Sequence, residues 1–90
     1  MRPSYRFVVT GRVQGVGFRA AVQGKAAFLG LRGWVRNRAD GAVEGLVGGE
    51  PGDVETFRQY LQKGPPASTV ERVEWSETSD TAEEGFLVRR

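Results

Sequence analysis

Residues 11–19, with the sequence Gly-Arg-Val-Gln-Gly-Val-Gly-Phe-Arg, are of the types that bind an anion. They follow an apolar run over residues 5–10 and precede a helical pattern over 20–29. Glycine allows positive φ and a close approach of backbone to ligand. Successive N–H groups at such a turn, with the positive end of the next helix, bind anions, and Arg19 adds a guanidinium that matches phosphate oxygens. The run predicts a cradle for one phosphate group, although a simple strand-to-helix turn would explain the glycines equally well.

Two nucleotide-binding motifs are excluded as explanations of this run. Residues 15–20 match the dinucleotide pattern G-x-G-x-x-A. That pattern requires an open parallel sheet built from several strand–helix–strand units, which a chain of 90 residues with a hairpin next in line does not provide. The run also lacks the Gly-Lys-Ser/Thr end of a P-loop.

A second run, residues 33–37, has the sequence Gly-Trp-Val-Arg-Asn, and Asp40-Gly41 and residues 64–66 (Gly-Pro-Pro) follow it. Together with residues 11–19, it closely resembles the acylphosphatase family. The resemblance covers residues 7–73 in the family's order and spacing. The two runs are specific only as a pair, because either alone occurs in unrelated proteins. The resemblance implies an enzyme that hydrolyses the carboxyl–phosphate bond of acyl phosphates to carboxylate and inorganic phosphate.

The family resemblance also implies roles for individual residues. Arg19 would bind the phosphoryl group and Asn37 would orient the attacking water. The phosphate-binding backbone N–H groups would be those of Gln14, Gly15, Val16, Gly17, Phe18 and Arg19. Considered without the resemblance, Arg19 fits an ordinary solvated charge and Asn37 fits a turn cap. Arg12, Arg36 and Arg38 are expected to be structural or solvated, and Trp34 is expected to belong to the core rather than to form a stacking platform.

Composition limits the available chemistry. The chain has no cysteine and no histidine, which removes disulfides, thiolate nucleophiles and the usual proton shuttle near neutral pH. With no acidic cluster beside the glycine-rich run, we expect no metal and no cofactor. The resemblance implies a small-molecule acyl phosphate substrate, with phosphate or sulfate as a competing anion. Net charge is only +2, so we expect neither nucleic acid nor membrane as a partner. The first residues lack a signal-peptide pattern, so we expect a cytoplasmic location. We also expect a monomer.

The elements that must position these residues follow from periodicity. Strand patterns cover residues 5–10, 31–37 and 42–48, helical stripes cover 20–29 and 51–63, and a last long strand contains Val73 and Trp75. Val70 has the wrong parity for that strand, which predicts either a bulge there or a later start of the strand. A further short strand is expected over 86–89. The order predicts one α+β domain over residues 1–90, a ferredoxin-like β-α-β-β-α-β sandwich with an antiparallel sheet and both helices on one face.

Two alternatives stay open from the sequence. Ferredoxin-like sheets also bind RNA through aromatic residues on the open face, but neither central strand has an aromatic-glycine-aromatic run. The chain could also be a phosphate-binding module without turnover, or one normally fused to a larger carbamoyl-phosphate enzyme. Ala20, Ala21 and Gly24 are small where family members often have bulkier residues, which leaves the shape of the site's rim open. The sequence does not identify the acyl group of the substrate.

Overall fold

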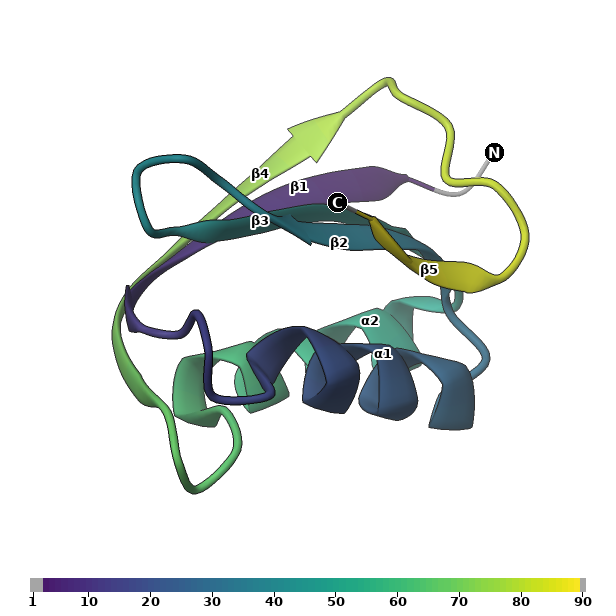
Figure 1. Cartoon of the computed structure of the whole chain (residues 1–90). Helices are drawn as coiled ribbons and strands as arrows, with labels where there is room; N and C mark the ends of the chain where they lie inside the picture. Colours follow the sequence, from purple (N-terminus) through teal and green to yellow (C-terminus); the bar gives the residue numbers. More distant parts are fainter. Residues whose placement is uncertain (1–2, 90) are drawn as a thin grey trace.

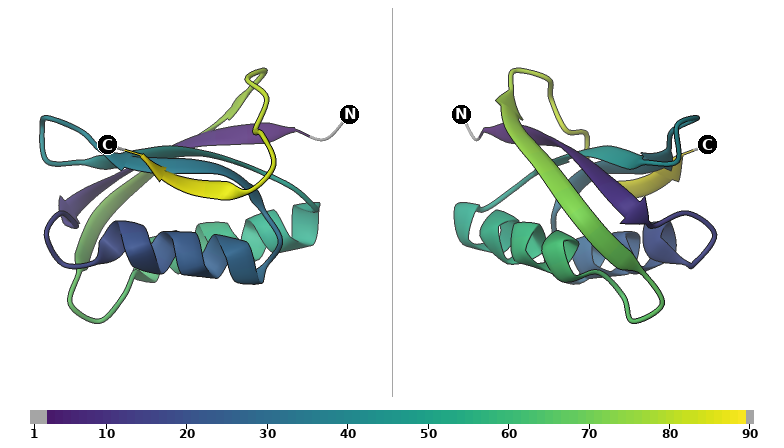
Figure 2. Two further views of the ribbon diagram at one scale, coloured as in Figure 1. Left: turned by 45° about the vertical axis from the view of Figure 1, so that its right-hand side comes forward. Right: turned by 90° about the vertical axis from the view of Figure 1, so that its left-hand side faces the viewer.

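The chain folds into one sheet with two helices on a single face (Figure 1). The computed structural model describes residues 3–89. The helices α1 and α2 lie side by side beneath the sheet in all the views, and the opposite face of the sheet is open (Figure 2). The elements, in chain order, are β1 (Ser4–Arg12), α1 (Phe18–Phe28), β2 (Arg32–Asn37), β3 (Val43–Gly48), α2 (Pro51–Lys63), β4 (Thr69–Thr78) and β5 (Phe86–Arg89).

The sheet has five strands in the order β4-β1-β3-β2-β5. The β1–β3, β1–β4 and β2–β3 pairs are antiparallel, as the ferredoxin-like pattern predicts. The fifth strand departs from that expectation because β5 pairs parallel with β2, which makes the sheet mixed. The physical reason is the path of the chain. The segment after β4 crosses one end of the sheet to the far edge (Figure 1), so the chain re-enters in the direction of β2.

The core lies between the sheet and the helices. Phe7 and Val9 of β1 are fully buried, as the alternation of residues 5–10 predicts. Helix α1 buries Phe18, Val22 and Ala26, and α2 buries Val54, Phe57 and Leu61, which are the predicted stripes. Phe57 joins the layers, with its ring centroid 5.5 Å from that of Phe7 and 5.8 Å from that of Phe86. Burying aromatic rings of this size supplies much of the free energy of folding.

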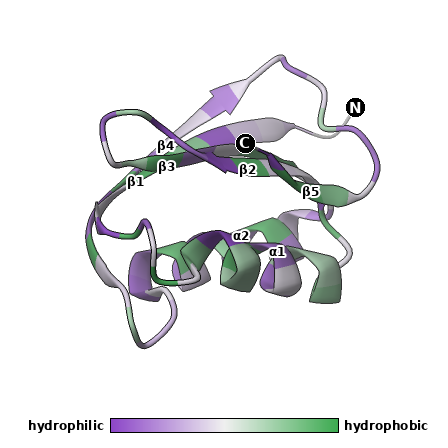
Figure 3. Cartoon of the chain, in the orientation of Figure 1, coloured by the Kyte–Doolittle hydropathy of each residue, from purple (hydrophilic) through white to green (hydrophobic). Residues whose placement is uncertain are grey.

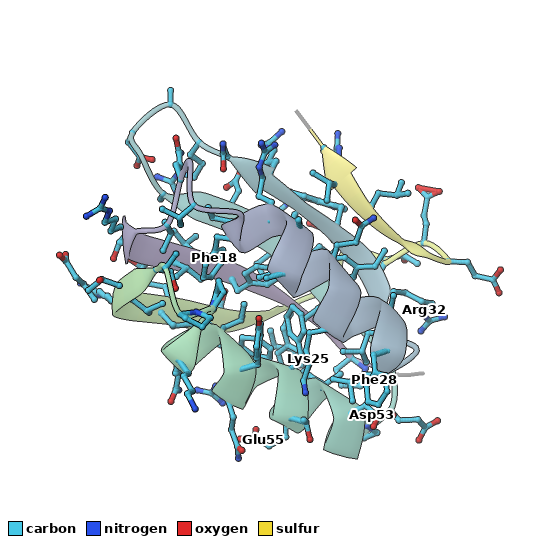
Figure 4. All side chains as sticks on the ribbon, turned by 60° about the horizontal axis from the view of Figure 1, so that its bottom comes forward. Phe18, Lys25, Phe28, Arg32, Asp53 and Glu55 are labelled. Carbon is cyan, nitrogen blue, oxygen red and sulfur yellow. The ribbon has the colours of Figure 1, made fainter. Side chains whose placement is uncertain are left out.

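Outside the core, charged and polar side chains lie between the two helices and along the end of β4. Phe18 points into the layer between helix and sheet, whereas Lys25 and Phe28 lie where α1 approaches α2 (Figure 4). Lys25 Nζ is 5.6 Å from the ring centroid of Tyr60, so this cation links the two helices. Hydrophilic colour dominates the end of β4 (Figure 3). That strand continues to Thr78.

The expected bulge in the last long strand is confirmed. Thr10 pairs with Arg72 and Gly11 pairs with Val70, so Glu71 is the extra residue on β4. Gly11 has a φ of 125° there, and a Cβ at this position would lie 2.2 Å from the carbonyl oxygen of Thr69. The bulge shifts the register of β4 by one residue, so Val70 packs against the core together with Val73 and Trp75 despite its different parity in the sequence.

The expectation that Trp34 belongs to the core is wrong. Val35 points toward the helices and is fully buried. Because side chains alternate along a strand, Trp34 faces the open side of the sheet, where it is half-buried. Trp34 is paired in register with Leu46 of β3 on one side and with Leu87 of β5 on the other.

Gly11→Ala should destabilise the protein, because the added methyl group would clash with backbone and alanine tolerates positive φ poorly. We expect a loss of about 1–3 kcal/mol in the free energy of unfolding. The matched control is Gly24→Ala, on the exposed side of α1 with no atom within 4 Å of the new Cβ, which should gain about 0.5–1 kcal/mol. Urea unfolding of both variants at one pH measures the difference. Equal stability of the two would show that Gly11 is not required by the bulge.

Candidate active site

The glycine-rich run turns the chain from the end of β1 into the start of α1. Val13 is buried and fixes the run to the core. Gly15 and Gly17 have φ values of 75° and 78°, in the left-handed region that glycine adopts at least cost. Helix α1 begins directly after Gly17, with no side-chain cap and no acidic residue in its first turn. The first backbone N–H groups of a helix have no partner within it, so the positive end of α1 is left to interact with an anion.

A cavity of about 200 Å³ lies at this turn. It brings together Arg19 from the start of α1 and Asn37 from the end of β2, the two residues expected to do the chemistry. Val88 of β5 closes one side. The residues that line the cavity are Val13, Gly15, Gly17, Phe18, Arg19, Ala20, Asn37 and Val88.

Asn37 enters the cavity because of its place in the sheet. It is the last residue of β2 and has the parity of Gly33 and Val35, so its side chain lies on the helix side. Its Oδ1 is buried and accepts no hydrogen bond from residues 3–89. Leaving a buried polar atom unpaired costs about 1–3 kcal/mol. A carbonyl oxygen kept at that cost beside a cationic cavity is available to accept a hydrogen bond from a ligand.

Arg19 is held from the opposite side by the last strand. Its Nη1 donates a hydrogen bond to the backbone carbonyl of Arg89, 3.2 Å away. The bond limits the rotation of the half-buried guanidinium and leaves its other N–H groups for an anion. Sequence reasoning missed Arg89 and Val88, because the only signal was a short apolar run with no indication that it would pair beside β2.

The side chain of Gln14 connects the cradle to the β2–β3 hairpin. Its Nε2 donates to the carbonyl oxygens of Arg38 at 2.7 Å and Ala42 at 2.8 Å. The two acceptors flank the hairpin turn that follows Asn37. Through these bonds the cradle loop and the strand end that positions Asn37 are held as one unit.

The hairpin turn itself is fixed by Asp40. The backbone N–H of Ala42 donates to Asp40 Oδ1 at 3.1 Å, and Arg38 Nη2 lies 2.7 Å from Oδ2. These contacts, the backbone bond first, hold the pKa of the Asp40 carboxyl below its usual value. A lowered pKa stabilises the folded state above the unfolded pKa near 3.8, and the contribution disappears as pH falls through the folded value. Near neutral pH the full contribution of Asp40 to the stability of the turn beside Asn37 is therefore present.

The other expected phosphate-binding positions divide into two groups. Gly15, Gly17 and Phe18 line the cavity, whereas Gln14 and Val16 do not. Ala20 also lines it, so the small residue at this position does belong to the rim, while Ala21 and Gly24 lie outside. Within residues 3–89 no group of three or more histidine, cysteine, aspartate or glutamate residues could hold a metal ion.

The chain matches proteins of one known family. The family model described as Acylphosphatase matches residues 5–88. The chain belongs to the acylphosphatase family. A relative from Azoarcus sp. (strain BH72), named acylphosphatase, is 49% identical over 78 residues, covering 87% of this chain and 80% of the relative. An acylphosphatase from Synechococcus sp. (strain CC9311) is 43% identical and 99% of each chain is covered.

Solved structures of acylphosphatases share the fold. The crystal structure of acylphosphatase from Bacillus subtilis superimposes with a TM-score of 0.92 at 38% identity, covering 98% of this chain and 99% of that one. The acylphosphatase from Coxiella burnetii gives a TM-score of 0.93 at the same identity. The ferredoxin-like architecture predicted from the sequence is therefore confirmed. Of the helices within residues 3–89, none has the length and apolar character needed to cross a membrane.

Gln14→Met should lower activity by loosening the cradle from the hairpin. Methionine keeps the length of the side chain but cannot donate the two hydrogen bonds. We expect kcat/KM for a simple acyl phosphate to fall by about 10-fold to 100-fold, the cost of a small misplacement of catalytic groups. Gln59→Met is the control, because Gln59 is exposed on α2 and its Nε2 donates to Glu55, 3.4 Å away, on the same helix. A variant of Gln14 that loses stability but keeps full kcat/KM would contradict this positioning role.

Proposed function

We propose that this acylphosphatase hydrolyses acyl phosphates by direct attack of water, with Arg19 holding the phosphoryl group and Asn37 orienting the water. The observation that carries the assignment is the shared cavity. It contains a half-buried guanidinium, the uncapped start of α1, and a buried carbonyl oxygen without a partner. An anion would interact with the guanidinium and with the start of α1. A neutral hydrogen-bond donor beside the anion would pair with the Asn37 carbonyl oxygen.

The reaction requires little from the protein beyond positioning. An acyl phosphate is a mixed anhydride, so its carboxylate leaving group is a weak base. The water oxygen bonds to phosphorus as the bond between phosphorus and the acyl oxygen breaks. The products are a carboxylate, inorganic phosphate and the proton released from the water. Because the transition state of phosphoryl transfer is largely dissociative, the water needs little deprotonation before it attacks. A site without histidine or cysteine is sufficient for this chemistry.

The two sides of the cavity would share the work. The backbone N–H groups of Gln14 to Arg19 and the guanidinium of Arg19 bind the equatorial oxygens of the phosphoryl group. Negative charge is spread over these oxygens in the transition state. The Asn37 carboxamide accepts a hydrogen bond from the water through Oδ1 and can donate through Nδ2 to a phosphoryl oxygen. Orienting the water for in-line attack supplies a large part of the rate. The hydrogen bond from Arg19 to Arg89 keeps the guanidinium in place before substrate binds.

The size of the cavity supports a simple phosphorylated substrate. Its volume of about 200 Å³ is below the range of about 300–1,000 Å³ that encloses a drug-sized ligand. A phosphoryl group would fill it and the acyl chain would extend past the rim at Ala20. A monomeric state stays a prediction. The expected cytoplasmic location stays a prediction.

Arg19→Lys should lose nearly as much activity as Arg19→Ala. Lysine keeps the charge but lacks the planar two-point match to phosphate oxygens. Phosphate release from a simple acyl phosphate, measured with EDTA present throughout, should fall by about 10²–10³-fold in both variants. Arg12→Lys is the control, at an exposed arginine outside the cavity. Near wild-type kcat/KM in Arg19→Lys would show that Arg19 acts only as a point charge. Loss of wild-type activity in EDTA, restored by magnesium, would refute the metal-free mechanism.

Inorganic phosphate and sulfate should inhibit competitively and raise the melting temperature. A ligand that binds only the folded state at 100 times its Kd stabilises it by about 2.7 kcal/mol. The comparison is chloride at equal ionic strength, and the stabilisation should disappear in Arg19→Ala. Noncompetitive inhibition would place the anion away from the cradle.

A further inference from the structure

The open face of the sheet has a cluster of arginines around one half-buried aromatic ring. The guanidinium carbons of Arg6, Arg36 and Arg89 lie 5.8, 5.2 and 4.7 Å from the centroid of the Trp34 ring. These residues come from β1, β2 and β5, and we call them the arginine–tryptophan cluster. Leu87, 59% exposed, is in register beside Trp34. The cluster faces away from the helices and from the cavity of Arg19 and Asn37.

Only part of the positive charge in the cluster is balanced. Glu44 pairs with Arg36 at 2.6 Å and lies 4.0 Å from Arg38. Asp80 pairs with Arg6 at 3.0 Å, in a pair whose side chains are about half exposed. Exposed pairs of this kind contribute little to stability, so a phosphate oxygen can replace the carboxylate. Arg89 has no carboxylate partner among the described residues.

The excess of arginine extends over the whole open face. The alternation of the paired strands places the following charged residues on it: Arg6, Arg32, Arg36, Arg72, Arg89, Glu44 and Glu74. With Asp80, which pairs with Arg6, the face carries five positive and three negative charges, so arginine is in excess there. The face is also wide, because it spans five strands. A broad basic surface with an aromatic ring fits an extended polyanion that has planar groups to stack.

We propose that the arginine–tryptophan cluster binds single-stranded nucleic acid. Trp34 and Leu87 provide the surface on which a base stacks, and Arg6 and Arg89 contact the phosphates on either side. Proteins that bind single strands without sequence preference combine these two features. The sequence alone predicts no nucleic-acid partner, because the net charge is small and Trp34 fits a core residue. The fold changes both premises, because it places Trp34 on the open face of the sheet and brings arginines from three strands together around it.

The test is fluorescence anisotropy of a labelled oligouridylate of about twelve nucleotides, within the site sizes of about 4–16 nucleotides of single-strand modules. Trp34→Leu should weaken binding by about 10-fold or more through loss of stacking, while Trp34→Phe should retain most of the affinity. Arg89→Gln should reduce the slope of log K against log salt by about 0.7, the value for one lost phosphate contact on a single strand.

Two control variants separate this surface from the rest of the protein. Arg58→Gln removes the same charge from α2, where Arg58 lies over Trp75 at 5.2 Å on the helix side, and should leave affinity unchanged. Arg19→Ala should also bind normally, because the cradle is not the proposed site. Circular dichroism confirms that each variant is folded.

Four results would overturn the proposal. They are no binding of the oligonucleotide at low salt, binding that is insensitive to Trp34→Leu and Arg89→Gln, loss of binding in Arg19→Ala, and binding of a duplex as tightly as the single strand. Trp34-dependent binding of phosphatidylserine vesicles without binding of the oligonucleotide would instead assign the face to a membrane surface and would equally refute a nucleic-acid site.

Discussion

The site depends on backbone N–H groups that the fold leaves without partners at the start of α1. Gly15 and Gly17 make the turn that brings the chain from β1 into the helix within a few residues. No side chain caps the helix, and no acidic residue lies in its first turn. In most helices a side-chain oxygen would occupy this position and add stability. Under the proposed mechanism this partial positive charge acts on the phosphoryl group, and Arg19 at the same end adds a full charge.

The sheet places the remaining groups against this helix end. Because β2 is next to β3 and β5, Asn37 and the carbonyl of Arg89 reach the cavity from two neighbouring strands. Gln14 then ties the cradle loop to the hairpin after Asn37. Each contact joins segments far apart in the chain, so the geometry of the site depends on the packing of the whole core rather than on one local motif. The unpaired Oδ1 of Asn37 is the part of this arrangement that reduces stability, and it lies where a substrate would be.

The sequence predicted most of the fold and the two central site residues, for physical reasons that also explain the failures. Periodicity identified the stripes of α1 and α2 because burial against one sheet face requires it, and the parity of Val70 revealed the bulge at Glu71. Trp34 was assigned to the core because hydrophobicity does not indicate which face of a strand is covered. Alternation with Val35 decides that, once both helices are known to lie on one side. The contact between Arg19 and Arg89 spans 70 residues and depends on parallel pairing of β5, which no local pattern specifies.

The most direct test of the central claim is a measurement of kcat, the phosphate inhibition constant and the melting temperature on Asn37→Ala. The account assigns phosphate binding to Arg19 and the backbone N–H groups, and water orientation to Asn37. It predicts a fall in kcat of about 10²–10³-fold, as when one preorganised hydrogen-bonding group is lost. The inhibition constant should change little. The melting temperature should not fall, since the lost carbonyl oxygen has no hydrogen-bond partner within residues 3–89. If kcat is retained while the melting temperature falls, Asn37 only caps a turn. If phosphate affinity is lost together with kcat, the division of roles between Arg19 and Asn37 is wrong.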